Sequence, residues 1–502
     1  PSDPSQRIYP PERGVTVRMY ATGFGDCFLL AFPGEDGNPR YVLIDCGVHD
    51  RYPKGRERLE AIARDIAEAT NRHLHVVAVT HEHSDHLYEF MYGKESFAEC
   101  EIDELWLAWT EDPDHPVAQE LTRLFGKRIQ ALQAALTRLQ AAGNPYAERI
   151  AALFGFDLGV NTARGMKGNK EILKFLREKS RNPLERPEDY KTPGRGPLEI
   201  PGVRGVKGYV LGPPEDVASI KRLDSQKETY LQPLTEETAL ISAILEAADI
   251  PLAGDSQEIQ GYPFDATYSV SLEKAVDMDF FREMYGFSDE KGHGPRWRRI
   301  ESDWLEEGVT KLALRVSGMV NNTSLVLAFA LTDATPPKVL LFAGDAQVGN
   351  WLSWQKAAWE GMTGRDLIRQ TVLYKVGHHG SANATLREKG LEMMESTELV
   401  AMLPVTRSGR TSRGGITLTR RSSPGCCSGR GGGSSGAIPF LTVIRLHHRT
   451  NPGKPSGSRS GSTWHGTRVL TSGGYSIRSR CDEMNARDRI YCRVPVVPEV
   501  YD

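Results

Sequence analysis

The sequence predicts an α/β fold whose core of short strands is interrupted by a large, mainly helical insertion. Strands alternate with a helix over residues 1–110, and a second group of strands begins after residue 305. Alternation of strands and helices is typical of layered α/β architectures. The chain of 502 residues is long enough for two or three domains, or for one large domain with an insertion.

Residues 1–110 are the predicted N-terminal half of the core. Its expected strands are residues 15–20, 27–32, 41–44 and 74–80. A turn at residues 23–26 separates the first two strands, and residues 59–70 have the apolar spacing of a helix.

Residues 111–305 are the predicted insertion. Its expected elements are helices at residues 118–142, 169–180 and 236–248, an exposed linker at 181–200, a buried core strand at 208–214 and an irregular polar segment at 252–300. Residues 306–405 complete the core. Their expected strands are residues 309–316, 323–330, 339–343, 370–376 and 399–405, with which the core closes.

Residues 406–502 form a basic tail that differs in composition from the rest of the chain. Arg, Gly, Ser and Thr dominate residues 406–480, with one short apolar patch at residues 438–446. Three explanations stay open here: a disordered tail, a shifted reading frame that replaces a native C-terminus, or a nucleic-acid-binding tail. The last is the weakest, because no aromatic residues alternate with the arginines for base stacking.

The net charge of −3 conceals an uneven distribution, since residues 1–400 carry −14 and residues 401–480 carry +13. No run approaches the roughly 18 apolar residues of a membrane span. The polar N-terminal segment also lacks a signal pattern. We therefore expect a soluble, cytoplasmic protein without a membrane partner. Cys27, Cys46 and Cys100 adjoin apolar runs, which favours reduced core thiols.

The segment THEHSDH at residues 80–86 carries the strongest chemical signal. Imidazole and carboxylate groups are common ligands of zinc-like ions. Because the segment follows a buried strand directly, its side chains project from a rigid edge. His81 and His83 point the same way from an extended chain and can chelate one ion, and Asp85 and His86 then face a second. The pattern predicts a metal centre rather than a solvated loop.

This motif resembles the signature of the metallo-β-lactamase superfamily. Three further segments resemble the motifs of that family, in its order: LIDCG at residues 43–47, LLFAGD at 340–345 and YKVGHHGS at 374–381. Three pieces look similar to the branch that contains the hydrolase domain of the DNA-uptake competence protein EC (Rec2): GFGD at 23–26, NNTSLVL at 321–327 and HHGS at 378–381. The resemblance covers residues 15–110 and 305–405.

The resemblance implies a four-layer αββα sandwich with two divalent ions, Zn2+ or Mn2+, at one edge of its two sheets. The implied ligands are His81 and His83 for the first ion, Asp85 and His86 for the second, Asp345 as a bridge, and His378 or His379 to complete the second site. The spacing after the strand does not choose between the paired histidines. Asp26 and Asp45 are expected to orient ligands or loops.

A third histidine for the first ion, common in the family, has no clear counterpart. His115 and His293 are the candidates, and neither follows a strand. The first site is therefore expected to be weaker, or to favour manganese over zinc.

The chemistry that follows is hydrolysis by a metal-activated water. Asp85 is a candidate for orienting the nucleophile, and Lys375 or a histidine of the pair, His379 included, for assisting the leaving group. The leading hypothesis is a phosphodiesterase or nuclease acting on nucleic acid. Its basic track would come from residues 181–191 or 296–299, although a solvated surface is the more common meaning of such clusters.

Two other functions stay open. A small-molecule hydrolase of lactones, thioesters or amides, with the insertion as a substrate lid, suits the acidic body better. A non-catalytic binding protein is least favoured, because the metal-binding motifs are intact. The sequence does not indicate protein partners.

Overall fold

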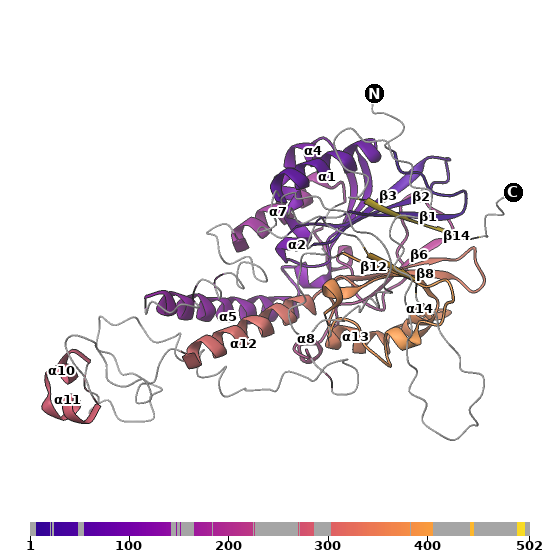
Figure 1. The fold of residues 1–502 in the computed structure, drawn as a ribbon. Helices are drawn as coiled ribbons and strands as arrows, with labels where there is room; N and C mark the ends of the chain where they lie inside the picture. Colours follow the sequence, from indigo (N-terminus) through magenta and orange to yellow (C-terminus); the bar gives the residue numbers. More distant parts are fainter. Residues whose placement is uncertain are drawn as a thin grey trace, which may run out of the picture. The chain divides into compact units, whose positions relative to one another are not determined.

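The computed structural model describes residues 7–48, 55–141, 165–225, 270–285, 303–404, 442–445 and 489–496, apart from residues 21, 23, 24, 183, 224, 271 and 382, together with residues 147 and 151. The chain forms two compact units (Figure 1). The first contains Pro1–Leu121, Arg164–Leu234 and Gly318–Asp502, and the second contains Thr122–Ala163 and Thr235–Ser317. Every residue of the candidate site lies in the first unit.

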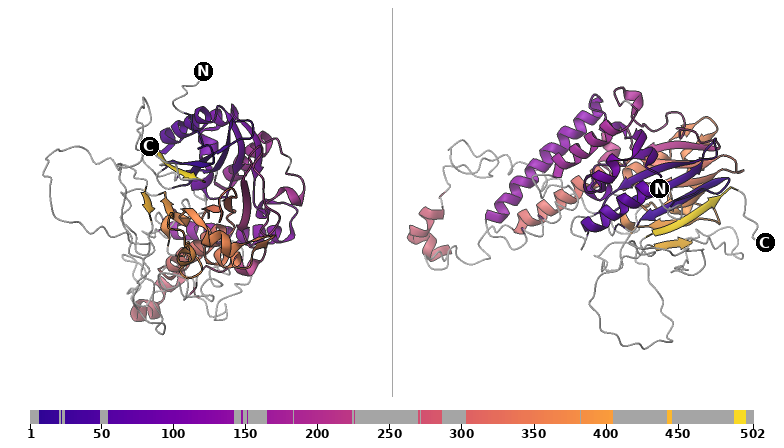
Figure 2. Two further views of the ribbon diagram at one scale, coloured as in Figure 1. Left: turned by 90° about the vertical axis from the view of Figure 1, so that its right-hand side faces the viewer. Right: turned by 90° about the horizontal axis from the view of Figure 1, so that it is seen from above.

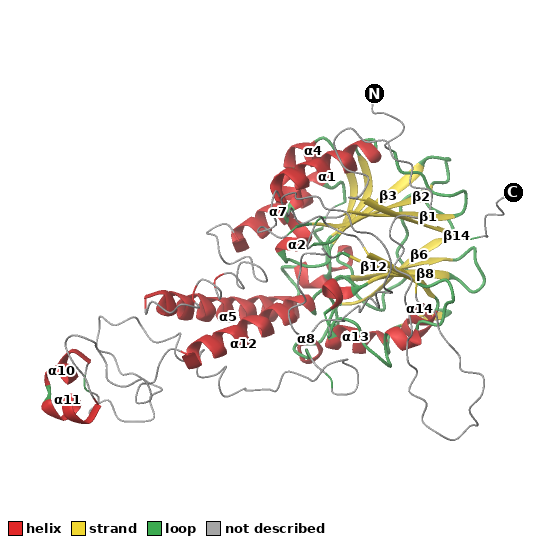
Figure 3. Cartoon of the chain, viewed as in Figure 1, coloured by secondary structure: helices red, strands yellow, loops and turns green. Residues whose placement is uncertain are grey.

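Two mixed six-stranded sheets form the first unit (Figure 3). The N-terminal sheet has the order β14-β1-β2-β3-β4-β5. Its strands are β1 (Gly14–Tyr20), β2 (Cys27–Pro33), β3 (Pro39–Cys46), β4 (His73–Ala78), β5 (Glu101–Trp106) and β14 (Arg489–Pro495). Strands β3, β4 and β5 run parallel, and the others pair antiparallel.

The C-terminal sheet has the order β13-β12-β11-β8-β7-β6. Its strands are β6 (Val206–Gly212), β7 (Val326–Leu331), β8 (Lys338–Phe342), β11 (Thr371–Lys375), β12 (Val400–Leu403) and β13 (Thr442–Arg445). Strands β8, β11 and β12 run parallel. A two-stranded hairpin of β9 (Ala358–Trp359) and β10 (Met362–Thr363) stands apart from both sheets.

One apolar core joins the two sheets. It combines side chains such as Val17 and Phe28 from the N-terminal sheet with Leu327, Phe329 and Phe342 from the C-terminal sheet. The rings of Phe28 and Phe342 meet edge to face across it, 5.5 Å apart between centroids. Burial of large apolar side chains is the main driving force for such packing, so the sheets are stacked face to face.

Helices cover the outer faces of both sheets (Figures 1 and 2). On the C-terminal sheet, α13 (Val348–Trp354) and α14 (Gly364–Arg369) bury Trp351, Trp354 and Leu367 in a second apolar core. On the N-terminal sheet lie α1 (Gly55–Ala69) and the short helices α3 (Glu89–Tyr92) and α4 (Lys94–Ala98). The α/β class predicted from the sequence is confirmed.

Of the remaining described helices, α2 (Ser84–Leu87) lies between β4 and β5, and the others begin after β5. These others are α5 (Pro116–Ala141), α7 (Gly165–Lys179), α8 (Val217–Ile220), α10 (Leu272–Asp277), α11 (Asp279–Tyr285) and α12 (Asp303–Asn321). The helices predicted at residues 118–142 and 169–180 are thus confirmed, and the strand predicted at 208–214 is β6. The helix predicted at residues 236–248 lies outside the described residues.

Two sequence predictions in this region are wrong. Residues 309–316, predicted as a strand, belong to helix α12. Leu312, Ala313, Val316 and Met319 are buried there at helical spacing, so the period of burial outweighs the strand preference of the valines. Within residues 252–300, predicted as irregular, α10 and α11 are helical.

The basic tail also departs from its prediction, because two strands within it extend the core. β13 pairs with β12, and β14 pairs with β1 along seven residues. The core therefore does not close at residue 405. Gly14 accommodates β14, since a Cβ at this position, with φ of +121°, would lie 2.1 Å from the carbonyl oxygen of Val494. Residues 405–441 and 446–488 lie outside the described residues.

The helices of the described residues include none that is long and apolar enough to cross a membrane. Cys27, Cys46 and Cys100 are buried thiols, and the sulfur atoms of Cys27 and Cys46 lie 3.2 Å apart on paired strands.

A buried ion pair fixes α1 on the N-terminal sheet. Arg18 of β1 donates to Asp65 of α1 over 2.8 Å, and the Tyr20 hydroxyl donates to the same carboxylate oxygen over 2.7 Å. Arg18 and Asp65 are almost completely buried. Removing one partner of such a pair leaves an uncompensated charge in the protein interior.

We therefore expect Asp65→Ala to lower the free energy of unfolding by about 3 kcal/mol. Urea denaturation followed by circular dichroism measures this change. The double variant Arg18→Met with Asp65→Ala serves as the control and should recover part of the loss. Equal stability of wild type and Asp65→Ala would contradict the assignment.

Candidate metal centre

The predicted metal-binding residues meet at one edge of the two sheets. Residues 80–86 follow β4, and Asp45 lies at the end of β3. Asp345 follows β8, and the histidine pair follows β11 in the 3-10 turn η6 (Gly377–Gly380). Ligand sites commonly form where the carboxyl ends of parallel strands meet. The bond from Leu325 N to Thr80 O, 2.7 Å long, joins the two sheets at this edge.

Three groups of His and Asp side chains at this edge are close enough to hold a metal ion. They are His81 with His86 and Asp345, Asp26 with Asp45 and His86, and Asp85 with Asp345 and His379. Within each group the ligand atoms lie within 4.8 Å of one another. His86 and Asp345 each belong to two groups, so the groups form one continuous centre.

The first subsite contains His81 and His83. Nε2 of His81 and Nδ1 of His83 are 3.0 Å apart. Two nitrogens that bind one zinc ion at about 2.0–2.1 Å have a similar separation. Thr80 donates its hydroxyl proton to Asp45, so this hydroxyl accepts from Nδ1 of His81, 3.0 Å away. The lone pair of His81 Nε2 then faces the centre.

Of the residues predicted for the second ion, Asp85, His86, Asp345 and His379 lie close together. In neutral His86, Nδ1 donates to Asp45 over 2.7 Å and Nε2 carries a lone pair 3.4 Å from Asp345. Nδ1 of His379 donates to the carbonyl of Pro404 over 2.9 Å, which leaves its Nε2 3.2 Å from Asp85. Partners of this kind fix the tautomer of metal-binding histidines.

Four buried polar atoms of the centre have no hydrogen-bond partner among the described residues. They are Oδ1 of Asp26, Nε2 of His83, Nε2 of His86 and Oδ2 of Asp345. Leaving such atoms unsatisfied in a protein interior costs about 1–3 kcal/mol each. A bound cation would satisfy Asp345 and His86 together, so the residues present fit a metal ion.

Lys375 balances part of the negative charge. Its ammonium group donates to the carbonyl of Gly344 over 2.7 Å and to Asp345 over 3.2 Å, and it forms an ion pair with Asp26. Lys375 is 1% exposed, so its three protons are committed to buried acceptors.

Burial and neighbouring charges set the protonation of these groups. Burial lowers the pKa of His83 to about 4, and burial with neighbouring His86 holds the pKa of His81 well below its usual value. Burial also lowers the pKa of His86, but Asp345 and Asp45 outweigh it and raise that pKa. Burial opposes ionisation of Asp345, yet the charges of His86 and Lys375 keep its pKa low.

Backbone strain is concentrated at the centre. Asp45, His378 and His379 have φ values of 53°, 41° and 49°, in the left-handed region. For residues with a side chain this conformation costs about 1–2 kcal/mol each. Strain of this kind is retained where the surrounding structure fixes one geometry. Here it directs His379 toward Pro404 and His378 toward Gln347.

His115, one candidate for a third histidine, does not lie at the centre. His115 packs on Trp109, with ring centroids 4.6 Å apart, and its Nδ1 accepts from Ala118 N at the start of α5. His293 lies outside the described residues. Sequence reasoning assigned no site role to Ser324 or Gln347. Ser324 accepts from Asp345 N over 3.1 Å, and Gln347 lies 3.5 Å from His378. The only sequence signal for a site role was that Ser324 lies within NNTSLVL and Gln347 two residues after LLFAGD.

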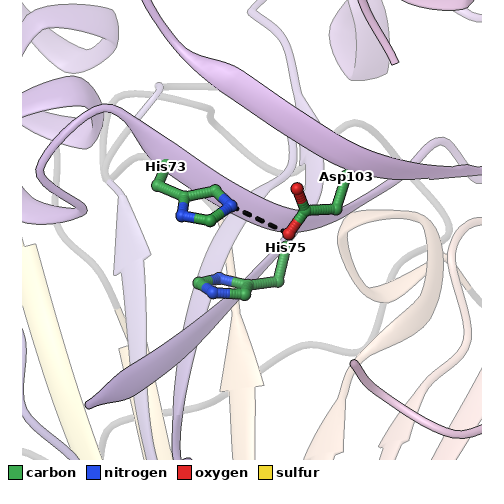
Figure 4. Close-up of side chains that lie close together, drawn as sticks. All are labelled: His73, His75 and Asp103. Carbon is green, nitrogen blue, oxygen red and sulfur yellow. Dashed lines mark hydrogen bonds and ion pairs between the residues drawn. The ribbon is translucent and has the colours of Figure 1, made fainter. Parts of the chain in front are cut away.

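A fourth His/Asp group lies away from this centre, at the start of β4 (Figure 4). Nε2 of His73 contacts Asp103 over 2.8 Å, and its ring stacks on His75. However, Tyr41 N donates to Nδ1 of His75, so a neutral His75 carries its proton on Nε2. The other oxygen of Asp103 accepts from Arg181. These atoms already have partners, and the group carries no metal assignment.

No protein-family model matches the sequence, and no curated protein matches it.

Asp45→Asn tests the support of His86. Asn tolerates a left-handed backbone, so the substitution mainly removes the charge that accepts from Nδ1 of His86 and from Thr80. We expect the affinity for Zn2+ to fall by about 10–100-fold, measured by competition with a chromophoric chelator. The conservative control is Asp103→Asn, which should leave the affinity unchanged. Equal affinities of wild type and Asp45→Asn would disprove this role.

The His75 pKa predicts an acid-dependent loss of stability. Burial and the neighbouring His73 lower this pKa to about 4, whereas an unfolded histidine titrates near 6.5. The unfolded chain therefore takes up a proton as the pH falls from about 7 to about 4, and the folded state loses stability in that window. In His75→Asn, the drop in unfolding free energy between pH 7 and pH 5 should be smaller by about 1 kcal/mol. Urea titrations at both pH values measure it, and equal drops would contradict the prediction.

Proposed function

We propose that this protein is a metal-dependent hydrolase of the metallo-β-lactamase fold, with two divalent ions, Zn2+ or Mn2+, bound at the edge of its sheets. The observation that carries the proposal is the convergence of Asp85, His86, Asp345 and His379. Among the described residues, Nε2 of His86 and Oδ2 of Asp345 have no hydrogen-bond partner there. Stacked sheets with helices on their outer faces agree with the four-layer αββα sandwich of that family.

The ligands divide between two ions. His81 and His83 would hold the first, and Asp85, His86 and His379 the second, with Asp345 between them. The bound ions would supply a water of lowered pKa and positive charge for the developing oxyanion. The protein positions these ligands through Thr80, Asp45 and Pro404, which fix the ring nitrogens that face the centre.

Asp85 and Lys375 take different roles in this proposal. Asp85 lies among the candidate metal-binding atoms, 3.2 Å from Nε2 of His379, and is suited to orient a nucleophilic water. Lys375 is buried against Asp26 and Asp345, so it serves as a fixed positive charge and not as a proton donor to the leaving group.

The proposed substrate is a phosphodiester, including nucleic acid. The side chains of Lys221 and Arg222 are exposed, and within the described residues they form no ion pair or hydrogen bond. Their segment is linked to the residues around the centre through Asn322. Asn322 donates to the carbonyl of Arg222 over 2.9 Å and accepts from the backbone nitrogen of Gln347, next to His378, over 3.0 Å. Free cations beside a metal centre favour an anionic substrate.

A small-molecule hydrolase of lactones, thioesters or amides is the second candidate. Two observations favour it: the net charge of −14 over residues 1–400, and the pairing of Arg181 with Glu101 and Asp103. Arg186 likewise pairs with Glu188 and Asp189. This predicted basic cluster is therefore largely neutralised. The other cluster, at residues 296–299, lies outside the described residues.

Cleavage assays separate the two candidates. With Mn2+ or Zn2+, we expect the protein to cleave labelled DNA, RNA or bis(p-nitrophenyl) phosphate, and Asp85→Ala to lower kcat/KM by more than about 100-fold. Hydrolysis of lactone or thioester substrates alone, by folded and metal-loaded protein, would favour the second candidate.

Charge variants add a second readout. Lys221→Gln with Arg222→Gln should raise KM for DNA and reduce its salt dependence. The matched control is Arg181→Gln, which removes a cation already engaged by Glu101 and Asp103.

A further inference from the structure

The two adjacent histidines after β11 present opposite tautomers to the metal centre. In neutral His379, Nδ1 donates to the carbonyl of Pro404, 2.9 Å away, and Nε2 carries a lone pair. This nitrogen lies 3.2 Å from Oδ2 of Asp85, a spacing suited to two ligands of one cation. The neutral rings of His81 and His86 have the same tautomer as His379, because each donates from Nδ1 to a neighbouring oxygen.

The neutral ring of His378 is held in the opposite tautomer. Its Nδ1 lies 3.5 Å from the amide nitrogen of Asn321 and 3.5 Å from that of Gln347. An amide nitrogen can only donate, so Nδ1 of His378 must accept. Neutral His378 therefore carries its proton on Nε2.

A chain of hydrogen bonds fixes the orientation of the Gln347 amide. The amide nitrogen of Asn383 donates to the carbonyl of Leu223 over 3.4 Å and to Oε1 of Gln347 over 2.9 Å. The hydroxyl of Ser381 donates to the other end of the Asn383 amide over 3.0 Å. Because a backbone carbonyl accepts only, Asn383 cannot be reversed, and the NH2 group of Gln347 is turned toward His378.

The Nε2–H group of His378 is the accessible polar group of the centre. Its Nε2 lies 4.0 Å from Oδ2 of Asp345, beyond hydrogen-bond distance. The His378 side chain is 23% exposed, compared with 8% for His379 and 1% for Asp345. A substrate oxygen that approaches the metal-binding atoms can therefore reach this proton.

We propose that His378 is not a metal ligand but the donor that binds a substrate oxygen beside Asp345, while His379 alone completes the second subsite. This inference rests on the proposed hydrolase function and deepens it. A fixed, neutral N–H donor next to bound cations suits an anionic oxygen, such as a non-bridging phosphodiester oxygen.

Metal binding tests the division of roles without reference to activity. Zinc content and zinc affinity of the full-length chain are compared for wild type, His378→Ala and His379→Ala. We expect His378→Ala to bind zinc within about twofold of wild type, and His379→Ala to lose more than about tenfold in affinity. A loss in His378→Ala as large as that in His379→Ala would overturn the proposal.

Nitrogen-15 spectra of histidine-labelled, zinc-loaded protein give a second readout. The signal that disappears in His378→Ala should carry its proton on Nε2. In Gln347→Leu with Asn321→Leu, which removes both amide donors, the preference for this tautomer should weaken. An Nδ1 proton on His378 in the wild type would overturn the proposal even if zinc binding were unchanged.

Kinetics with bis(p-nitrophenyl) phosphate then test the donor role. His378→Ala should lower kcat/KM about 10–100-fold, and His378→Gln, whose amide offers an N–H near the same position, should recover part of it. If His378→Ala matched wild type, the donor role would be overturned. If wild type cleaved no phosphodiester, the proposed function would fail, while the zinc and tautomer measurements would still decide whether His378 is a ligand.

Discussion

The candidate metal centre depends on the ion pairs that the buried Lys375 forms with two carboxylates. Its ammonium group lies between Asp26, at the edge of the N-terminal sheet, and Asp345, which follows β8 of the C-terminal sheet. Four carboxylates, those of Asp26, Asp45, Asp85 and Asp345, are buried at this edge, and one lysine neutralises only one of them. Concentrated negative charge in a protein interior is unfavourable unless cations or protons accompany it. The fold therefore buries uncompensated negative charge next to histidine nitrogens that can bind a cation.

Most of this centre could be predicted because its residues lie in short local patterns. Residues 80–86 directly follow a buried strand, and the same holds for Asp345 and for the histidine pair, so strand ends alone place them near one edge. The proposed choice between His378 and His379 could not be predicted from the sequence. It depends on Pro404, Asn321 and Gln347, which are distant from the pair or from one another in sequence, and on a left-handed backbone at both histidines.

The errors in the predicted fold have a similar origin. The valines in residues 309–316 have strand preference, but the burial of Leu312, Ala313 and Val316 follows the period of helix α12. In the tail, β13 (TVIR) and β14 (RIYCRVP) are short runs with strand-favouring residues, but the composition of the tail, dominated by Arg, Gly and Ser over residues 406–480, concealed them. Their pairing with β12 and β1 is a contact between distant parts of the chain. His115 illustrates the opposite case, a potential ligand that instead caps the start of α5 and packs on Trp109.

Strand β14 has a consequence for the behaviour of the molecule in concentrated solution. It covers β1, whose seven residues would otherwise present free N–H and C=O groups along the edge of the sheet. Open edges of this kind template pairing between molecules and promote aggregation. β14 itself presents Tyr491 and Arg493 to solvent, and Tyr491 packs against the guanidinium group of Arg18. Proteolytic removal of β14 would therefore expose the edge of β1 to pairing with another molecule. The candidate metal-binding side chains would not be removed.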